Sequence, residues 1–181
     1  YELHVNLTKE GLGVFNEIDR GEMNLKTGYF KALSAKWYYG TVAYLKTSYT
    51  RNFSYLLQEG LGYQEKFVRG FQPYVVDGQH YALTRNEIKY KLFEFTIKLG
   101  KLMPIEQFST VPYSVYIKGF TDWGYVVNNQ PEITTRLANR LTSGHGIGVD
   151  IVSYYDAVLR FEYAYNSLQE LGFNIHLAKA L

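Results

Sequence analysis

The sequence contains no cysteine, only four prolines and almost no net charge. The lack of cysteine excludes disulfide scaffolds, cysteine-bound zinc and thiol catalysis. The 19 basic and 17 acidic residues leave a formal charge of +2, so there is no basic excess of the kind that nucleic-acid binding requires. No apolar run approaches the roughly 18 residues of a membrane helix, which excludes a helical membrane protein. A membrane β-barrel is not excluded, because its strands alternate apolar and polar side chains.

Aromatic residues are abundant, with 18 tyrosines and 11 phenylalanines among 181 residues. The length predicts a single domain. The mean hydropathy of −0.23 is as mild as alternating strands produce on average. The chain starts at Tyr1, without an initiator methionine or an apolar secretion signal. We therefore expect a fragment or a processed product of a longer chain.

Alternation with a period of two recurs along the chain and predicts β-strands. In residues 1–8 the odd positions are apolar and the even positions are polar. Residues 9–28 stay unassigned because four glycines interrupt them. The pattern predicts eight strands, around residues 1–8, 29–39, 42–51, 86–92, 113–125, 147–151, 159–166 and 171–178.

The predicted connections are of two kinds. Short ones are expected at 39–41, 155–156 and 167–169, and long ones at 52–85 and 127–143, as in outer-membrane barrels. The polar face carries rows of charge, so it must contact water, whereas the apolar face is rich in tyrosine and tryptophan near the strand ends. We therefore predict an all-β fold and favour an antiparallel transmembrane β-barrel over a soluble barrel or sandwich.

The first long loop carries the most specific motif. Its segment Phe67-Val68-Arg69-Gly70-Phe71 resembles the Val/Ile-Arg-Gly-Phe/Tyr signature of the BamA family of outer-membrane assembly factors and their translocation relatives. The order of the following strands is similar as well, and the resemblance covers nearly all of residues 1–181. It implies the C-terminal half of a sixteen-stranded barrel, without the first eight strands and the periplasmic POTRA repeats.

The resemblance also implies a site. In the family, the signature arginine lies at the tip of an extracellular loop folded into the barrel, where inward-facing carboxylates hold it. Carried over, Arg69 pairs with Asp122 and, as a second partner, with Glu87. An arginine fork matches carboxylates in bidentate geometry, and Gly70 lets the backbone approach closely. Glu94 has the opposite parity to Glu87 in the same predicted strand, so it is the weaker candidate.

The last strand carries a second motif. Residues 170–177 resemble the C-terminal targeting signal of bacterial outer-membrane barrels, and the residues concerned are Gly172, Phe173, Ile175 and Leu177. A free strand edge can be recognised by strand addition. In the family this strand meets the first barrel strand at a weak seam that opens for a client. The chain departs from the family in ending with Leu181 rather than an aromatic residue, and in lacking Gly-Gly before the signature.

Catalytic and metal-binding patterns are poor. The four histidines are scattered without acidic residues at ligand spacing, and there is no Ser/His/Asp arrangement. Residues 144–148 imitate a phosphate loop but run into a predicted strand, so their glycines are expected to relieve crowding in a curved sheet. We expect no enzyme activity, no cofactor and no metal.

The function that the resemblance implies is insertion of barrel proteins into the bacterial outer membrane through a seam at the last strand. The implied partners are outer-membrane lipids, unfolded outer-membrane clients and accessory lipoproteins, with no nucleic acid. A bilayer thinned beside the seam would lower the insertion barrier. The alternatives are a superfamily translocator for protein secretion, the barrel of a fused enzyme, a passive small outer-membrane barrel and a soluble binding barrel.

Overall fold

One antiparallel sheet accounts for most of the chain. The computed structural model describes residues 1–10, 19–50, 58–98, 110–129, 136–153 and 157–179. In these residues there are eight strands and no helix, which confirms the predicted all-β class and the predicted strand number. The strands are β1 (Glu2–Glu10), β2 (Arg20–Ala32), β3 (Trp37–Thr50), β4 (His80–Lys98), β5 (Thr110–Val127), β6 (Leu141–Ser153), β7 (Ala157–Asn166) and β8 (Leu171–Lys179).

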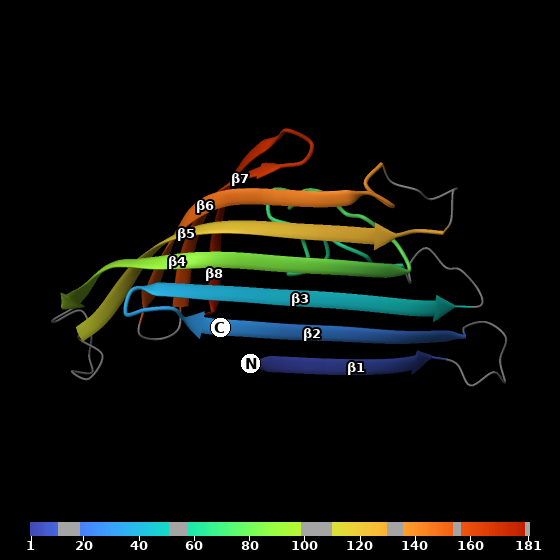
Figure 1. Ribbon diagram of the computed structural model, residues 1–181, viewed down its shortest axis with the longest axis horizontal. Coiled ribbons are helices and arrows are strands. Elements are labelled where there is room, and N and C mark those ends of the chain that lie inside the picture. Colours follow the sequence, from blue (N-terminus) through green and yellow to red (C-terminus); the bar gives the residue numbers. More distant parts are fainter. Residues whose placement is uncertain (11–18, 51–57, 99–109, 130–135, 154–156, 180–181) are drawn as a thin grey trace.

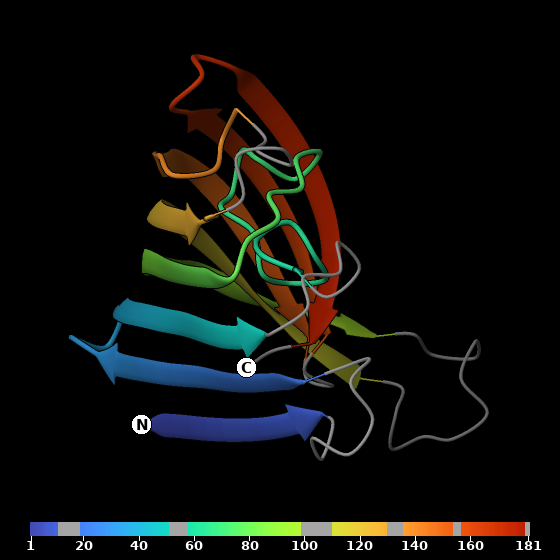
Figure 2. The same cartoon turned by 90° about the vertical axis from the view of Figure 1, so that its right-hand side faces the viewer.

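The sheet is an open meander (Figure 1). Each strand pairs with its neighbours in sequence, and β1 and β8 form the two edges. Twisted strands make such a sheet curve. Figure 2 shows the sheet curling around residues 58–79, which precede β4 in the chain and lie on the concave inner face. Because β1 and β8 are the edge strands, each has one side whose backbone amides and carbonyls pair with no described strand.

The two faces of the sheet differ as the alternation predicts. On the inner face of β5, Lys118 and Asp122 are both buried. On the outer face, the neighbouring Ile117 and Trp123 are exposed. Such large exposed apolar side chains occur on the outer face of nearly every strand and include Leu3, Val5, Leu7, Met23, Leu45, Ile88, Ile147, Leu159, Tyr163, Phe173, Ile175 and Leu177.

The boundary between β2 and β3 corrects the sequence prediction. The strand predicted at 29–39 was wrong, because residues 33–36 form the turn that joins β2 to β3. Two consecutive amides, of Leu33 and Ser34, donate to the carbonyl of Trp37 at 2.8 and 3.3 Å. The turn predicted at 39–41 lies inside β3, and most of β2 occupies the unassigned stretch 9–28.

The other connections follow the prediction more closely. A short turn at 167–170 joins β7 to β8, and residues 128–140 join β5 to β6. The loop predicted at 52–85 extends too far, because β4 begins at His80; of the predicted loop, the structure describes residues 58–79 as loop and leaves 52–57 outside the described residues. The turn predicted at 155–156 lies outside the described residues.

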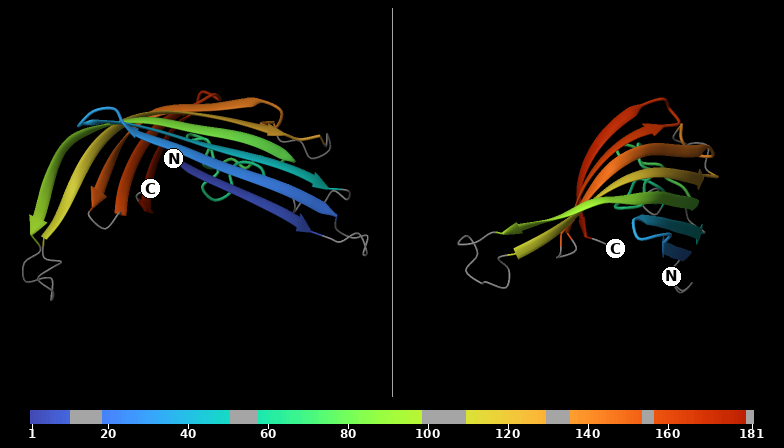
Figure 3. Two further views of the ribbon diagram at one scale, coloured as in Figure 1. Left: turned by 60° about the horizontal axis from the view of Figure 1, so that its bottom comes forward. Right: turned by 60° about the vertical axis from the view of Figure 1, so that its left-hand side comes forward.

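β4 and β5 are the longest strands, with 19 and 18 residues, and one end of this pair extends beyond the neighbouring strands (Figure 3). A β-bulge interrupts β4 between Lys91 and Phe93. The extra residue reverses the alternation, so Glu94 lies on the inner face and accepts a hydrogen bond from Ser114 Oγ at 3.0 Å. Glu94 and Glu87 therefore share a face, and the opposite faces predicted from their parity were wrong. The ion-pair partner of Glu94 is Lys91 rather than Arg69.

The main apolar core lies between the segment of residues 58–79 and the inner face of the sheet. Leu83 of β4 is fully buried there, and Val126 of β5 is nearly so. Burying an apolar side chain of this size contributes about 1.5–3 kcal/mol. The segment thus covers part of the inner face as a second sheet would in a sandwich. It contributes the buried side chains Leu61, Val68, Phe71 and Val76 to this core.

Candidate functional site

Residues 58–79, which we call the signature loop, fold back over the inner face of the sheet (Figure 2). The backbones of Leu61 and Val76 exchange two hydrogen bonds, of 2.9 and 2.8 Å, which close the loop near its base. At the tip, the amide of Phe71 donates to the carbonyl of Val68 at 2.9 Å. Gly70 has φ of 94°, in the left-handed region that favours glycine. This tight turn directs the preceding side chain into the sheet.

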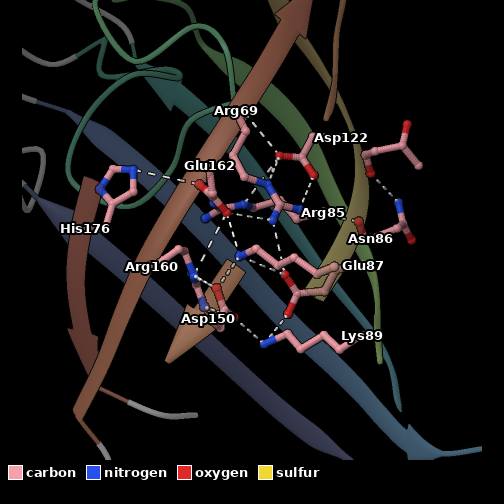
Figure 4. Close-up of polar contacts among 12 residues, drawn as sticks. Arg69, Arg85, Asn86, Glu87, Lys89, Asp122, Asp150, Arg160, Glu162 and His176 are labelled. Atoms are coloured by element: carbon pink, nitrogen blue, oxygen red, sulfur yellow. Dashed lines mark hydrogen bonds and ion pairs between the residues drawn. The ribbon is translucent and has the colours of Figure 1, made fainter. Parts of the chain in front are cut away.

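The side chain so directed is Arg69, which is paired with Asp122 of β5 (Figure 4). Its Nε donates to Asp122 Oδ2 at 2.7 Å and its Nη2 donates to Oδ1 at 2.6 Å. The backbone amide of Arg69 donates to the same carboxylate at 3.1 Å. The side chains are 2% and 0% exposed. The pair therefore combines bidentate geometry with nearly complete exclusion from bulk water.

Two further carboxylates reach the same guanidinium. Arg69 Nη1 donates to Glu87 Oε2 at 3.1 Å and to Glu162 Oε1 at 3.3 Å. The guanidinium carbon also lies 4.0 Å from the ring centre of Phe120, a favourable cation–π arrangement. Sequence reasoning proposed Asp122 and Glu87 as partners but missed Glu162. The available signal was that Glu162 shares the polar face of its strand.

These contacts determine the charge state of Arg69. Burial alone would lower the pKa of its guanidinium, but the hydrogen bonds and charge of Asp122, with the charges of Glu87 and Glu162, raise that pKa above its ordinary value. Arg69 therefore stays cationic under all physiological conditions. A buried charge held in this way is stable only while its partners remain in place.

A second group of ions lies next to the Arg69 site on the inner face. Lys118 Nζ lies 2.9 Å from Asp150 and 2.7 Å from Glu162, and its side chain is fully buried. Lys89 bridges Glu87 and Asp150, at 3.0 Å from each. The whole cluster contains one more cation than carboxylates, so its charges nearly cancel. It comprises Arg69, Arg85, Lys89, Lys118 and Arg160 with Glu87, Asp122, Asp150 and Glu162.

Two glycines leave room for the signature loop. A Cβ placed on Gly144 of β6 would lie 1.8 Å from the carbonyl oxygen of Arg69. A Cβ on Gly124 of β5 would lie 2.6 Å from Val68 Cγ2. Sequence reasoning expected the glycines at 144–148 to relieve crowding within the sheet. At Gly144 the space is instead occupied by the signature loop.

The variant Gly144→Ala is expected to displace the loop tip, since the clash is with backbone rather than with a flexible side chain. Overpacking of this kind costs about 1–3 kcal/mol of unfolding free energy. Urea unfolding in detergent micelles measures the change. The matched control is Gly119→Ala in β5, where the nearest atom, Ile88 Cγ2, is 3.9 Å away. Equal stability of the two variants would contradict the role assigned to Gly144.

The base of the signature loop has an anchor of its own, which the sequence did not indicate. Lys46 Nζ donates to the carbonyl of Glu59 at 2.6 Å, and Ser48 Oγ donates to the carbonyl of Gln79 at 2.7 Å. Lys46 also lies 3.4 Å from Glu22. Two inward side chains of β3 thus hold both ends of the loop.

The residues singled out in the last strand lie on both faces of β8. Phe173, Ile175 and Leu177 point outward and are exposed. Gly172 lies on the inner side, opposite Ala164 of β7. None of the four is among the partners of Arg69 described above. β8 approaches the loop through a different side chain, His176, whose ring stacks on that of Phe67 with centres 6.3 Å apart.

No metal-binding group emerges from the described ranges, where no three histidine, aspartate or glutamate side chains are placed to hold an ion. Within the same residues there is no helix long and apolar enough to span a membrane. The charges of the ionic cluster pair with one another, and Arg69 joins the signature loop to the sheet through them.

Comparisons with known proteins add no relative to this description. No protein-family model, curated protein or solved structure matches the chain. The interpretation of the site therefore depends on the signature residues and on the contacts that they make.

Proposed function

We propose that the chain is the C-terminal part of a β-barrel assembly factor of the bacterial outer membrane, which inserts other barrel proteins. The observation that carries this proposal is the buried pairing of Arg69 with Asp122, Glu87 and Glu162. A loop arginine held by inward-facing carboxylates is the arrangement that the signature motif implies. An ordinary solvated loop arginine would not be 2% exposed.

The outer face supports a membrane location. It is covered with exposed apolar side chains, which on a soluble monomer would form an unusually large patch. Tyr39 and Tyr49 lie near opposite ends of β3 on this face, about ten residues apart. At about 3.3 Å per residue and a strand tilt of about 40°, they are separated by about 25 Å across the membrane. This spacing suits two aromatic girdles around an apolar band.

The open edges support a half-barrel. A sheet with two free edges tends to pair with other strands. In the proposed protein, eight preceding strands of the same polypeptide pair with the edge of β1 and meet β8 at a seam. The curvature of the sheet and its polar inner face suit such a closure.

The proposed mechanism has no covalent step, so the protein is not an enzyme. The free edge of β8 offers backbone donors and acceptors to an unfolded client strand, which adds to it by β-augmentation. In the proposed mechanism, the exposed outward side chains Phe173, Ile175 and Leu177 of the short final strand contact lipid beside this seam. Thinning of the bilayer at this position lowers the insertion barrier. Accessory lipoproteins act as further partners.

Site-specific crosslinking tests this mechanism. Cysteine at Ile175 on the edge strand β8 is expected to form adducts with an incoming barrel protein during its assembly. The matched control is cysteine at Leu45, which is also exposed on the outer face but lies in the interior strand β3. Absence of any adduct at Ile175, or equal adducts at both positions, would refute seam-templated insertion. A passive barrel or a secretion translocator is then the better interpretation.

A further inference from the structure

The turn between β7 and β8 is bonded to the tip of the signature loop. Asn166, the last residue of β7, is 1% exposed. Its Nδ2 donates to the carbonyl of Gly70 at 2.8 Å and to Glu170 Oε2 at 2.9 Å. Its Oδ1 accepts the amides of Leu168 and Glu170, at 2.9 and 3.0 Å. One buried side chain therefore closes the turn and binds the loop at the same time.

The other oxygen of the Glu170 carboxylate also binds the loop. Tyr74 OH donates to Glu170 Oε1 at 2.7 Å. Hydrogen bonds from Asn166 and Tyr74 lower the pKa of the Glu170 carboxyl below its usual value, so the acceptor is ionised at neutral pH. Glu170 immediately precedes Leu171, the first residue of β8. The start of the last strand is thus tied to the loop.

A second contact ties the loop to the far part of β8. His176 stacks on Phe67 of the loop with an angle of 29° between the ring planes. His176 Nε2 lies 3.8 Å from Glu162, which in turn binds Arg69 (Figure 4). The loop therefore contacts Glu170, in the turn just before β8, and His176, six residues further along, within β8.

We propose that the β7–β8 turn is a latch that couples docking of the signature loop to pairing of the terminal strand, with Asn166 and Glu170 as its positioning residues. Coupling of this kind is reciprocal, so undocking the loop loosens β8 by the same factor as loosening β8 undocks the loop. The inference rests on the proposed function only in the statement that client strands add to the free edge of β8. The position of the signature loop would then control how readily β8 separates from its neighbours to accept a client strand.

Paired tyrosine variants test the latch from the loop side. Tyr74→Phe removes one hydroxyl, and with it the hydrogen bond to Glu170, while every residue of the turn and of β8 stays the same. Tyr63→Phe is the matched control, because the Tyr63 hydroxyl donates to Asp77 within the loop. Amide hydrogen exchange is measured on the intact protein in detergent micelles. Tyr74→Phe is expected to speed exchange in residues 171–177 about fivefold, which corresponds to the loss of one hydrogen bond, with β6 unchanged.

Asn166→Asp tests the latch from the turn side. The new carboxylate keeps the oxygen that accepts the two turn amides, but it places a second oxygen against the Gly70 carbonyl and the Glu170 carboxylate. Exchange is expected to rise about tenfold both in β8 and in loop residues 67–71. The matched control is Leu168→Ala, whose side chain is exposed in the same turn.

Unchanged exchange in β8 for both Tyr74→Phe and Asn166→Asp would overturn the latch, as would an equal effect of Tyr63→Phe. Client adducts at Ile175, measured in parallel, separate the two proposals. Faster exchange without any client adduct keeps the latch and refutes the insertion function. Adducts with unchanged exchange keep the insertion function and refute the latch.

Discussion

Replacing Asp122 with alanine is expected to destabilise the protein by about 3–5 kcal/mol and to release the signature loop. The reason is that the buried Arg69 would lose its bidentate partner and keep only the longer contacts to Glu87 and Glu162, and removing one partner of a buried ion pair is far costlier than losing a surface pair. Urea unfolding in micelles measures the free energy. Protease sensitivity of residues 58–79 measures the release of the loop.

A double-mutant cycle identifies the origin of the loss. Arg69→Met combined with Asp122→Ala removes both charges, so the double variant is expected to be more stable than the sum of the single effects predicts. Glu94→Ala is the control, because Glu94 is an inner-face carboxylate that pairs with Lys91 rather than with the loop. Wild-type stability and a protected loop in both single variants would show that Arg69 is not anchored by this pair.

A charge swap of Arg69 and Asp122 is expected to restore only part of the stability. The structure explains the limit, since an acid at position 69 would face Glu87 and Glu162 as well. The new carboxylate would be repelled by these two glutamates, which destabilises the swapped variant. Arg69→Lys is expected to lie between the wild type and Arg69→Ala, because it keeps the charge but loses the planar fork.

Replacing Lys118 with methionine is expected to cost a similar amount, about 3–5 kcal/mol of unfolding free energy. Methionine keeps the volume but removes the cation that Asp150 and Glu162 share at 2.9 and 2.7 Å, so each buried carboxylate loses one of its cationic partners. The loss is expected to shrink at acidic pH, where protonation neutralises these two carboxylates. Urea unfolding at neutral and acidic pH tests both statements.

The control for Lys118 is Lys91→Met, which removes another inner-face lysine on the neighbouring strand. Lys91 is partly exposed and pairs with an exposed Glu94. Its replacement is expected to leave the unfolding midpoint nearly unchanged, because solvent screens such pairs. If the two lysine variants behaved alike, the ionic cluster would contribute no more than a set of surface charges.

The strands that could be predicted from sequence were those whose two faces differ most. In β5, β7 and β8, outward apolar residues alternate with inward polar ones, and the register leaves no ambiguity. β2 escaped prediction because Gly21 and Gly28 within it resemble turn glycines. The true turn at 33–36 contains neither glycine nor proline. The bulge of β4 was missed although the sequence carries a sign of it, because Leu92 and Phe93 are consecutive apolar residues and the alternation continues from Phe93 with the other parity.

The site was predictable in part. The motif around Arg69 and the parity of Asp122 and Glu87 indicated a loop arginine facing carboxylates. Parity predicts which face of the sheet a side chain lies on, but not its position along the strand direction. The sequence therefore could not show that Glu162, rather than Asp150, reaches Arg69. The roles of Gly144 and Asn166 depend on where the loop tip comes to rest, which no local pattern encodes.

The distances along the chain between Arg69 and its partners bear on the order of folding. In a meander every strand pair joins neighbours in sequence, so hairpins can form one after another with little loop-closure entropy. The signature loop is the exception, because two of the carboxylates that bind Arg69 lie 53 and 93 positions further along the chain. While β7 is missing, the arginine lacks Glu162 and the loop lacks Asn166. Full docking of the loop is therefore expected only after β7 has joined the sheet, and a protein folded less far is distinguished by a signature loop that proteases can still reach.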